Sequence, residues 1–542
     1  MANVKFPRKE FEKEIKITPE VIEKISLFGT PLESITNEDI EIEVFPNRPD
    51  LLSMQGFLRA FKAFLGKDTG LKTYKIKKPE NNFKVKIHPS VKSVRPFTAC
   101  AIVKNLSFND EKIKEIIELQ EKLHSTVGRN RKKLAIGIYP LEKITLPITY
   151  KAESPENIKF IPLEMDKELT GRQILQKHPT GREYAHLLEG FEKFPIFVDS
   201  KGKVLSMPPI INSHETGKIS HETKAVFVEC SGFDFKILKN TLNIIVTTLA
   251  DMGGEINSMI LDYGKEKVIS PNLSPETMRI SLENTNRLLG LNLKESDLQK
   301  LLPKMGYDYS NSKVKIPAWR CDILHEVDII EDIAIAYGYQ NLIPEIPQIS
   351  TIGSESQESI TKRKVSELLI GMGLLELSTF HLIKPEEISC FKNLDKIELE
   401  NSKTEYKLLR PNLLIPTLRI LSENKDNEYP QKTFEIGSVF SIDKQKTTET
   451  GIKEQTNLIV SSTPGNFTEV KQILDYLSQN LCFSYTLKEE PIEGLIDGRS
   501  AQIFVNNKPI GYIGEAHPAI LKHNNLKLSL SVLELSLPQL FK

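Results

Sequence analysis

The chain has 542 residues, more than one hydrophobic core can organise, so its length predicts three or four domains. Its hydrophobic content of 39% and charged content of 27% are those of an ordinary globular protein. Lys and Arg together number 72, as do Asp and Glu, which excludes the overall positive charge of a dedicated nucleic-acid-binding domain, so any contact with RNA must be local.

Residues 1–82 predict an N-terminal domain followed by a linker. In the stretch FPNRPDLLS (45–53), Pro49 pre-sets the backbone angle of a first helical position. Apolar residues then recur at helical spacing until Gly66 ends the helix. Residues 67–82 are polar and rich in Lys, which indicates a linker.

Residues 83–270 have the mixed texture of an α/β domain. Helices are predicted at 110–124 and 234–252. Six apolar runs predict strands: VKIHP, CAIVKN, LAIGIY, FPIFVD, VLSMPPII and AVFVEC. The densest basic stretch, GRNRKK at 128–133, leads into one of them. A solvated loop explains this stretch at least as well as a phosphate contact does.

The segment from Met207 to Asp234 is rich in Asn, Ser, Thr and His between two predicted strands. Its histidines His214 and His221 have six residues between them and no nearby Cys, which is poor spacing for a zinc site. Neither lies beside a nucleophile motif. Two interpretations stay open, an ordinary surface loop or the polar lining of a pocket over the sheet.

Residues 271–347 predict a small, mostly helical domain with a cluster of acids in the stretch CDILHEVDIIEDIAIAYGY. The cluster has four members of interest: Asp322, Asp328, Glu331 and Asp332. The last three lie at i, i+3 and i+4 on one face of a predicted helix, where like charges destabilise by roughly 0.2 to 0.5 kcal/mol per pair. Either a hard cation such as Mg²⁺ or Ca²⁺ compensates them, or Arg320 and solvent screen the helix edge.

Residues 348–542 follow a Pro-, Ser- and Gln-rich boundary and are again mixed in texture. Helices are predicted at 361–372 and 467–480, and strands at FEIGSVF, NLIVSS, AQIFVN and PIGYIGE. The block has no Gly-rich phosphate loop, no H-E-x-x-H and no G-x-S-x-G motif. It therefore predicts no catalytic site of those kinds.

Cysteine usage and hydropathy predict a reducing, cytoplasmic location without a membrane partner. The five cysteines are scattered and form no C-x-x-C pair, which argues against a disulfide framework. No apolar run reaches the roughly 18 residues of a membrane helix, and the charged N-terminus lacks the apolar region of a signal peptide. Together, the blocks predict an α/β and α+β multidomain protein.

Eight segments spread over essentially the whole chain carry a more specific signal: FPNRPDLLSMQGFLRAFKAFLG, GRNRKKLAIGIY, PPIINSHETGKISHETKAVFVECSGFD, LNIIVTTLADMGG, IPAWRCDILHEVDIIEDIAIAYGY, LLRPNLLIPTLRIL, FEIGSVF and DGRSAQIFV with YIGEAHP. In this order they resemble the β subunits of phenylalanine–tRNA ligase in their archaeal and eukaryotic form. One such segment alone is weak, whereas eight in family order are highly specific.

The resemblance implies an aminoacyl-tRNA synthetase subunit of four parts. These are an N-terminal domain that couples to the partner subunit, a central domain of the tRNA-editing type, a small helical domain, and an antiparallel-sheet domain similar to a class II synthetase core without its active site. It also implies an (αβ)₂ heterotetramer whose α subunit uses ATP to attach phenylalanine to its tRNA. In FEIGSVF, this chain lacks the Arg that a catalytic class II chain would present two residues before a Glu.

The resemblance assigns the acidic cluster to Mg²⁺ shared with the α subunit. The implied ligands are Asp322, Asp328, Glu331 and Asp332. The match to the family's editing loop gives four candidates for hydrolysis of tyrosyl-tRNA: Asn212, Ser213, Thr223 and Glu229.

One departure from the family bears on editing. Where the archaeal family tends to read V-T-G-T-D, this chain has CSGFD, so Cys230, Ser231 and Phe233 replace smaller or hydroxyl-bearing residues. The bulk of Phe233 is expected to compete for space in the pocket. The alternative function is therefore an architectural and tRNA-binding subunit with an inactive editing pocket.

Overall fold

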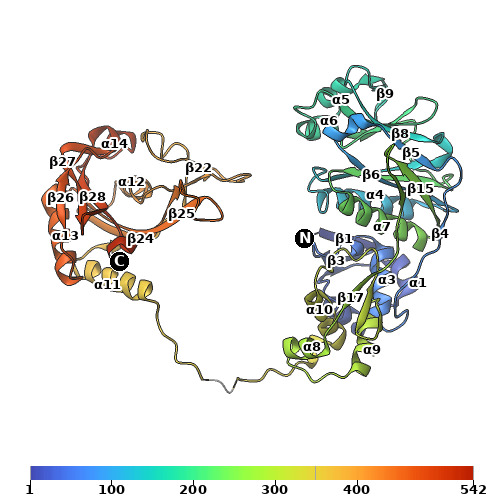
Figure 1. Ribbon diagram of the computed structural model, residues 1–542, viewed down its shortest axis with the longest axis horizontal. Coiled ribbons are helices and arrows are strands. Elements are labelled where there is room, and N and C mark those ends of the chain that lie inside the picture. Colours follow the sequence, from blue (N-terminus) through green and yellow to red (C-terminus); the bar gives the residue numbers. More distant parts are fainter. Residues whose placement is uncertain (1, 348–349, 541–542) are drawn as a thin grey trace. The chain divides into compact units, whose positions relative to one another are not determined.

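The computed structural model describes residues 2–347 and 350–540. The chain forms two compact units, Met1–Ile346 and Pro347–Lys542 (Figure 1). The first unit spans the residues of the three domains that the sequence predicts before residue 348. Their separate boundaries stay predictions.

The N-terminal part of the first unit pairs a small sheet with three helices. The antiparallel sheet has the order β1-β3-β2. Its strands and helices are β1 (Ala2–Pro7), α1 (Arg8–Glu14), α2 (Pro19–Leu27), β2 (Leu32–Ile35), β3 (Asp39–Val44) and α3 (Met54–Phe64). The predicted end of the last helix is confirmed, because Gly66 has a φ of 78°, a value that glycine adopts without steric strain.

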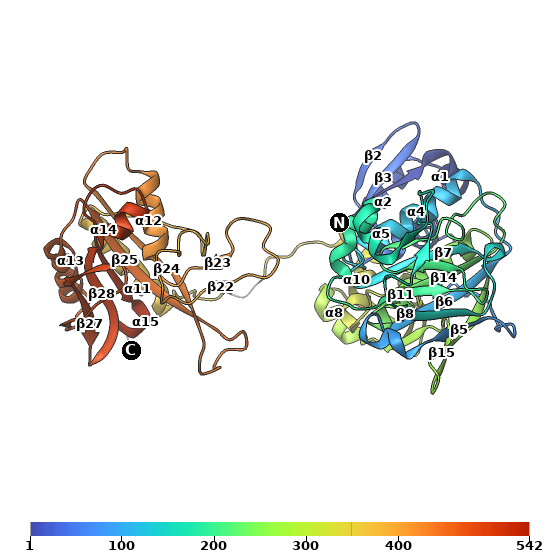
Figure 2. The ribbon, with the colours of Figure 1, turned by 90° about the horizontal axis from the view of Figure 1, so that it is seen from above.

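An eleven-stranded sheet forms the centre of the first unit (Figure 2). Its main path runs β13-β12-β11-β8-β5-β15-β6-β14-β7, and β4 and β16 also pair with β15. The strands are β4 (Ile76–Lys77), β5 (Lys84–Ile87), β6 (Phe97–Lys104), β7 (Leu134–Pro140), β8 (Ile148–Glu153), β11 (Phe194–Val198), β12 (Val204–Met207), β13 (Ile211–Asn212), β14 (Val226–Gly232), β15 (Glu255–Asp262) and β16 (Lys267–Ser270). The six predicted strands are confirmed, whereas β8 and β15 were not predicted.

Two long helices pack beside this sheet. They are α4 (Asp110–Ser125) and α7 (Phe235–Asp251), which confirm the two predicted helices. Helix α7 packs against β6 and β14, and α4 contacts β7. The short elements β9 (Lys159–Phe160), β10 (Leu169–Thr170), α5 (Gly171–Lys177) and α6 (Pro179–Tyr184) lie farther from the N-terminal part (Figure 1).

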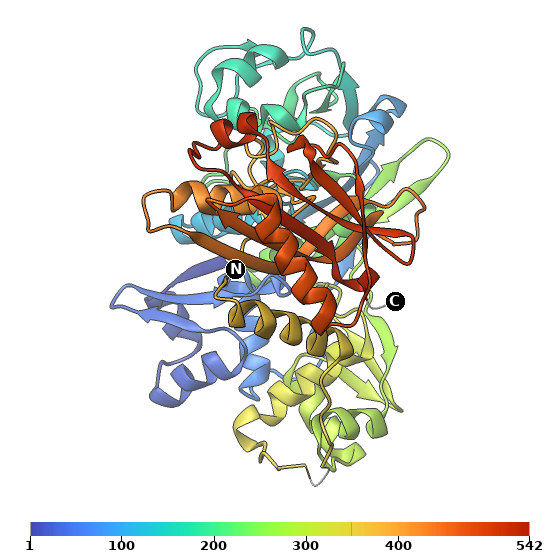
Figure 3. The same ribbon diagram turned by 90° about the vertical axis from the view of Figure 1, so that its left-hand side faces the viewer.

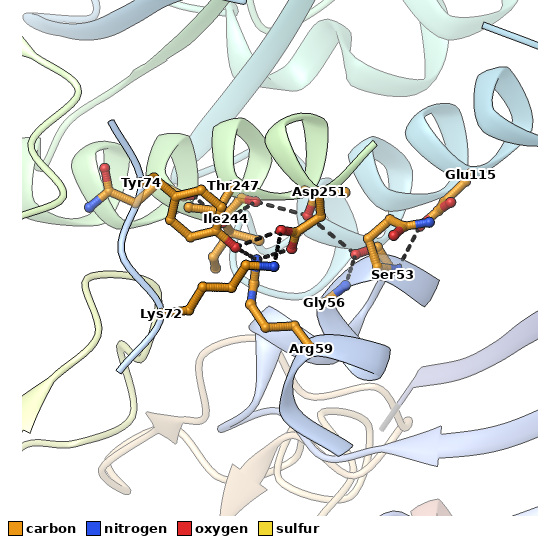
Figure 4. Close-up of polar contacts among 12 residues, drawn as sticks. Ser53, Gly56, Arg59, Lys72, Tyr74, Glu115, Ile244, Thr247 and Asp251 are labelled. Carbon is orange, nitrogen blue, oxygen red and sulfur yellow. Dashed lines mark hydrogen bonds and ion pairs between the residues drawn. The ribbon is translucent and has the colours of Figure 1, made fainter. Parts of the chain in front are cut away.

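A buried polar junction ties α3 to α7 (Figure 4). Asp251 accepts hydrogen bonds from Arg59 Nη1 (2.6 Å), Lys72 Nζ (2.8 Å) and the Tyr74 hydroxyl (2.7 Å). The Arg59 guanidinium also lies 4.4 Å from the ring centroid of Trp319, which belongs to the helical part. Breaking a buried ion pair leaves an uncompensated charge, so this junction helps to hold all three parts in one unit.

The last part of the first unit is less purely helical than predicted. Its helices are α8 (Leu282–Leu289), α9 (Glu295–Lys304) and α10 (Glu326–Tyr337). They accompany an antiparallel sheet, β17-β19-β18, formed by β17 (Glu276–Arg279), β18 (Asp308–Ser310) and β19 (Lys313–Ile316). The sequence analysis missed this sheet because its strands have only three or four residues each.

The second unit is built on a seven-stranded sheet in the order β20-β24-β25-β29-β28-β27-β26, antiparallel except for β20 with β24. Its strands are β20 (Leu375–Glu376), β24 (Gln431–Ile442), β25 (Ile452–Thr463), β26 (Thr486–Glu489), β27 (Leu495–Val505), β28 (Lys508–Ala516) and β29 (Ser531–Ser536). A smaller sheet contains β21 (Leu382–Ile383), β22 (Ile397–Glu398) and β23 (Leu408–Leu409). The large sheet of this unit is therefore mainly antiparallel, and its likeness to a class II core stays a prediction.

Helices accompany the large sheet of the second unit. Helix α13 packs on β25, β28 and β29 (Figure 3). The helices are α11 (Gln357–Gly371), α12 (Leu414–Glu423), α13 (Phe467–Asn480), α14 (Pro518–His523) and α15 (Leu537–Leu540), of which α11 and α13 were predicted. Over the described residues of the whole chain, no helix combines the length and apolar character that spanning a membrane requires.

Candidate functional site

A cavity of about 470 Å³ lies where the two ends of the central sheet approach each other. Strands β12 and β13 form one end of the sheet order and β7 forms the other. The Tyr139 hydroxyl of β7 lies 3.3 Å from Asn212 Oδ1 of β13 and donates across the gap. Arg131, just before β7, donates to the Ile210 carbonyl at 2.8 Å. Residues far apart in sequence therefore line one cavity of the size that small ligands occupy.

Glu229 is the buried acid of this cavity. It is 1% exposed, and its Oε1 lies 3.2 Å from the Tyr139 hydroxyl while its Oε2 has no hydrogen-bond partner. Burial raises the pKa of Glu229 to about 8, so the carboxyl is mainly neutral at pH 7. Gly137 lies opposite it in the β-ladder, where an added Cβ would stand 2.7 Å from Glu229 Oε1. Only glycine leaves room for the carboxyl.

Unpaired polar atoms gather around the cavity. Nine buried side-chain nitrogen and oxygen atoms lack a partner within the described residues, and four of them belong to residues that line it: Arg131 Nε, His178 Nδ1, Ser206 Oγ and Glu229 Oε2. A buried polar atom that truly lacks a hydrogen bond costs about 1 to 3 kcal/mol of stability. The concentration of such atoms around the cavity indicates a site built for a polar ligand.

Two histidines of the cavity are oriented by backbone groups. His178 Nε2 lies 3.0 Å from the Leu163 carbonyl, which can only accept, so Nε2 carries a proton. In the tautomer with this single proton, Nδ1 is an acceptor, and it has no partner within the described residues. His124 Nε2 accepts from the Ile136 amide at 2.8 Å. Burial lowers the pKa of His124, which keeps that ring neutral. His178 is thus the histidine with an available lone pair.

The structure separates the four residues predicted for this site. Asn212 and Glu229 both line the cavity. Ser213 and Thr223 are buried but are not among its lining residues. The Ser213 amide donates to the Leu205 carbonyl, and the Thr223 hydroxyl accepts from the Ser220 amide. These two residues take part in local backbone hydrogen bonds, and their predicted role in editing stays a prediction.

The CSGFD departure does not close the cavity. Phe233 is 50% exposed, lies 5.3 Å from the Arg95 guanidinium and does not line the cavity, so the expectation that it fills the pocket is wrong. Strand alternation places Cys230 in the core shared with α7, on the face opposite Glu229. Ser231 O accepts from Arg95 Nη2 at 2.7 Å.

A pH dependence of stability follows from Glu229. Its folded pKa of about 8 exceeds its ordinary 4.5, so the stability that protonation contributes is full below about pH 4.5 and is lost as the pH rises through 8. Glu229→Gln keeps the shape and removes the titration. We therefore expect the melting temperature of the variant, relative to the wild type, to rise between about pH 5 and pH 8. A difference in melting temperature between the variant and the wild type that stays constant across this pH range contradicts the assignment.

The acidic cluster is compensated in part by Arg320. Both oxygens of Asp322 accept from this guanidinium, at 2.8 and 2.7 Å, and Asp332 Oδ2 accepts from it at 2.7 Å. Against the raising effect of burial, Arg320 lowers the pKa of Asp322. Tyr307 also donates to Asp332. The screening that the sequence analysis left open is thus present for two of the four acids.

The remaining acids lie on α10, as predicted. Asp328 Oδ2 accepts from the amides of Leu324 and His325 and caps the helix, while Glu331 is exposed and forms no ion pair within the described residues. Burial, and then the charges of Asp332 and Asp328, raise the pKa of Glu331. No group of three or more His, Cys, Asp or Glu side chains in the described ranges is arranged to hold a metal ion. The four acids do not fit a cation as one set, and negative potential is left only beside Glu331.

Known proteins resemble both units of the chain. Residues 343–537 match the family described as the phenylalanyl tRNA synthetase beta chain CLM domain, and residues 278–339 match the tRNA synthetase B5 domain. The phenylalanine–tRNA ligase beta subunit of Thermococcus sibiricus is 37% identical over 504 residues, which cover 92% of this chain and 90% of that protein. The beta subunit of Archaeoglobus fulgidus is 36% identical over 533 residues, covering 96% and 95%.

One solved structure resembles the first unit in particular. It is an N-terminal fragment of the phenylalanyl-tRNA synthetase beta subunit from Pyrococcus horikoshii, with 36% sequence identity and a TM-score of 0.59. The match covers 62% of this chain and 99% of the fragment.

Proposed function

The chain belongs to the family of phenylalanine–tRNA ligase beta subunits, and we propose that it joins an alpha subunit in an (αβ)₂ heterotetramer that attaches phenylalanine to its tRNA. Support comes from the two relatives named above, which this chain matches over 90% and 95% of their lengths. In this assembly, ATP is a substrate of the alpha subunit. The beta subunit contributes tRNA contacts and a second, hydrolytic site.

One contact among the described residues of the second unit supports the proposal that this unit does not form aminoacyl-adenylate. Glu435, in the stretch FEIGSVF of β24, is buried and accepts from Arg410 Nη1 at 2.7 Å. The same carboxylate accepts from the Thr379 hydroxyl. A guanidinium that is 1% exposed and already paired is not available to an ATP phosphate. Phenylalanine activation is therefore assigned to the alpha subunit.

The hydrolytic site is the cavity around Glu229, and it receives the side chain of a wrongly attached tyrosine. One observation carries this assignment: Glu229 lines the cavity, and its buried Oε2 has no hydrogen-bond partner within the described residues. A neutral carboxyl both donates and accepts, so it pairs with the phenol of tyrosine. Phenylalanine lacks the hydroxyl and leaves the carboxyl unpaired, and sites of this kind discriminate by about 10⁴ to 10⁵.

Hydrolysis requires a water molecule and a base. His178 Nδ1 has no hydrogen-bond partner within the described residues and acts as the base. It takes a proton from the water molecule as the oxygen of that water bonds to the ester carbonyl carbon. The bond between that carbon and the ribose oxygen of the tRNA then breaks. The ribose oxygen receives the proton, and free tyrosine and uncharged tRNA are released.

A complex supplied with tyrosine, ATP and tRNA separates this function from the architectural alternative. If the complex edits, each tyrosyl-tRNA is hydrolysed after it forms, and the released tRNA is charged again. ATP is then consumed continuously while the concentration of tyrosyl-tRNA stays low. An architectural subunit with an inactive pocket instead lets tyrosyl-tRNA accumulate until the tRNA is consumed. The two products, AMP and tyrosyl-tRNA, are measured in the same reaction.

Mg²⁺ binding is assigned to the exposed end of the acidic cluster, with further ligands from the alpha subunit. Asp328 Oδ1, Asp332 Oδ1 and both oxygens of Glu331 have no hydrogen-bond partner within the described residues, and carboxylate oxygens are the ligands that Mg²⁺ prefers. Asp322 would not bind the ion directly, because both of its carboxylate oxygens accept hydrogen bonds from Arg320. It would instead hold the Arg320 side chain in place. The ion would supply positive charge at the subunit contact.

Glu331→Gln tests the Mg²⁺ assignment without removing a helix cap. In the absence of Mg²⁺, we expect an unchanged or slightly higher melting temperature of the α/β complex, because repulsion from Asp332 and Asp328 is removed. Added Mg²⁺ should raise the melting temperature of the wild type by a few degrees and that of the variant by less. An equal rise in both proteins contradicts the assignment.

A further inference from the structure

The loop of residues 128–133, here called the basic loop, stands beside the cavity. It joins the end of α4 to the start of β7. Both of these elements line the cavity, through His124 on the helix and Ala135 on the strand. The basic loop therefore lies between two elements that line the cavity.

The basic loop is held in one conformation. Arg129, Asn130 and Arg131 have φ values of 47°, 53° and 63°, a left-handed run that non-glycine residues rarely adopt. The Arg131 amide donates to the His124 carbonyl at 3.0 Å and the Lys133 amide donates to the Gly128 carbonyl at 2.8 Å. Such strain persists only where the surroundings enforce it, and it concentrates at functional sites.

Arg131 anchors the loop to the cavity wall. Its guanidinium donates to the Ile210 carbonyl and to Glu121 Oε1 at 3.1 Å, and lies 4.6 Å from the centroid of the Tyr184 ring. Hydrogen bonding to His124, and then the Arg131 guanidinium, lower the pKa of Glu121. The Arg131 side chain is therefore bound to the cavity wall, and the solvent-facing charges of the basic loop come from other residues.

Three cations of the loop face solvent without acidic partners. They are Arg129, Lys132 and Lys133, all exposed, and none forms an ion pair with a described carboxylate. Elsewhere on the cavity lining, Glu164 and Glu183 are exposed acids. The chain as a whole has equal numbers of acidic and basic residues. The three cations therefore give a local positive potential at the basic loop, and the two acids give a negative potential at another part of the cavity lining.

We propose that the basic loop binds the phosphates of the single-stranded 3′ end of an aminoacylated tRNA, so that the ester enters the cavity in one direction. The substrate has matching polarity, since its phosphates are negative and the α-ammonium of its aminoacyl group is positive. Phosphate contacts fix register and orientation, which suits a site that must bring one ester bond to His178. This inference rests on the proposed editing function for the identity of the ligand.

The test uses the α/β complex and two non-hydrolysable probes. One is a 5′-phosphorylated CCA trinucleotide carrying a 3′-tyrosylamide, which has three phosphates, and the other is adenosine 3′-tyrosylamide, which has none. The variant replaces Arg129, Lys132 and Lys133 with Gln. Each phosphate contact on a single strand contributes about 0.7 to the slope of log Kd against log salt. Between about 50 and 200 mM salt, we therefore expect trinucleotide affinity to fall about 20-fold more in the wild type than in the variant.

Two matched variants complete the design. Gln in place of Lys201, Lys265 and Lys267 removes three exposed charges away from the cavity lining and should leave both Kd values unchanged. Arg129→Lys with Lys132→Arg and Lys133→Arg keeps the charges and should restore the salt slope. Adenosine 3′-tyrosylamide should bind the wild type and the Gln variant equally.

Failure of this inference is distinguishable from failure of the editing function. A wild-type complex that does not bind the trinucleotide, or an equal salt slope in the wild type and the Gln variant, overturns the role of the basic loop. Deacylation of tyrosyl-tRNA by the wild type is measured in parallel. If deacylation is absent while the salt slopes differ as expected, the loop assignment stands and the editing function fails.

Discussion

Glu229→Ala is expected to slow hydrolysis of tyrosyl-tRNA by the α/β complex about a hundredfold. The carboxyl is the one acid that is fully buried in the cavity, and its unpaired Oε2 is the partner assigned to the tyrosine hydroxyl. Without it, a bound phenol loses its partner, and the cost of about 1 to 3 kcal/mol for an unpaired buried group corresponds to this loss of rate. The measurement is the single-turnover rate of deacylation of preformed tyrosyl-tRNA.

A nearby acid provides the control for this prediction. Glu222 is exposed, lies seven positions before Glu229 and does not line the cavity, so Glu222→Ala should keep the wild-type rate. Glu229→Gln should retain more activity than the Ala variant, because an amide still pairs with a hydroxyl. Equal deacylation by the wild type and Glu229→Ala shows that the tyrosine hydroxyl is read elsewhere.

The chain without its alpha subunit is expected to show no phenylalanine-dependent exchange of pyrophosphate into ATP. The stretch FEIGSVF has no Arg two residues before Glu435, and Arg410, which reaches this carboxylate, is buried and paired. A cation that stabilises a phosphate must be free to contact it. The expected change on adding the alpha subunit is from background to full exchange, the largest effect in this account.

The control for exchange is a complex assembled from the wild-type chain and an alpha subunit whose own ATP site is inactivated. It should stay at background, which excludes a contribution from the second unit. Exchange by highly purified beta chain, increasing with its concentration and dependent on phenylalanine, contradicts the assignment of activation to the alpha subunit.

The sequence predicted those elements of the fold whose patterns are local. Strand β14 reads VFVECSG and is buried throughout, and the apolar residues of the predicted stretch AVFVEC were a sufficient signal for it. Strand β15 was missed because Glu255, Asn257 and Ser258 interrupt its apolar residues, although the strand is central in the sheet. The side chain of Ser258 bonds to the Lys77 carbonyl, a tertiary partner that no local pattern reveals.

The cavity could be predicted only in part. Asn212 and Glu229 were found through family resemblance, whereas Tyr139, His178 and Ser206 were not. These residues meet because the strands at the two ends of the sheet lie near each other. This proximity depends on the topology and curvature of the sheet, which no local sequence pattern reveals. The unpaired state of Glu229 Oε2, on which the proposed specificity depends, also appears only after folding.

The acidic cluster shows the limit of spacing arguments. The spacing correctly placed Asp328, Glu331 and Asp332 on one helix. The spacing did not decide whether a cation or Arg320 compensates these acids, because the answer depends on the conformation of the long Arg320 side chain. The guanidinium folds back onto Asp322 and reaches Asp332, and this leaves Glu331 as the exposed, unpaired acid.

The most direct test of the hydrolytic site compares two substrates in one assay. Tyrosyl-tRNA and phenylalanyl-tRNA, both made on the phenylalanine tRNA, are incubated separately with the wild-type α/β complex, and their rates of deacylation are measured. A cavity in which Glu229 pairs with the phenol predicts hydrolysis of tyrosyl-tRNA at least about a thousandfold faster than that of phenylalanyl-tRNA. Equal rates, or no hydrolysis of tyrosyl-tRNA above the spontaneous rate in buffer, contradict the account and leave the architectural function.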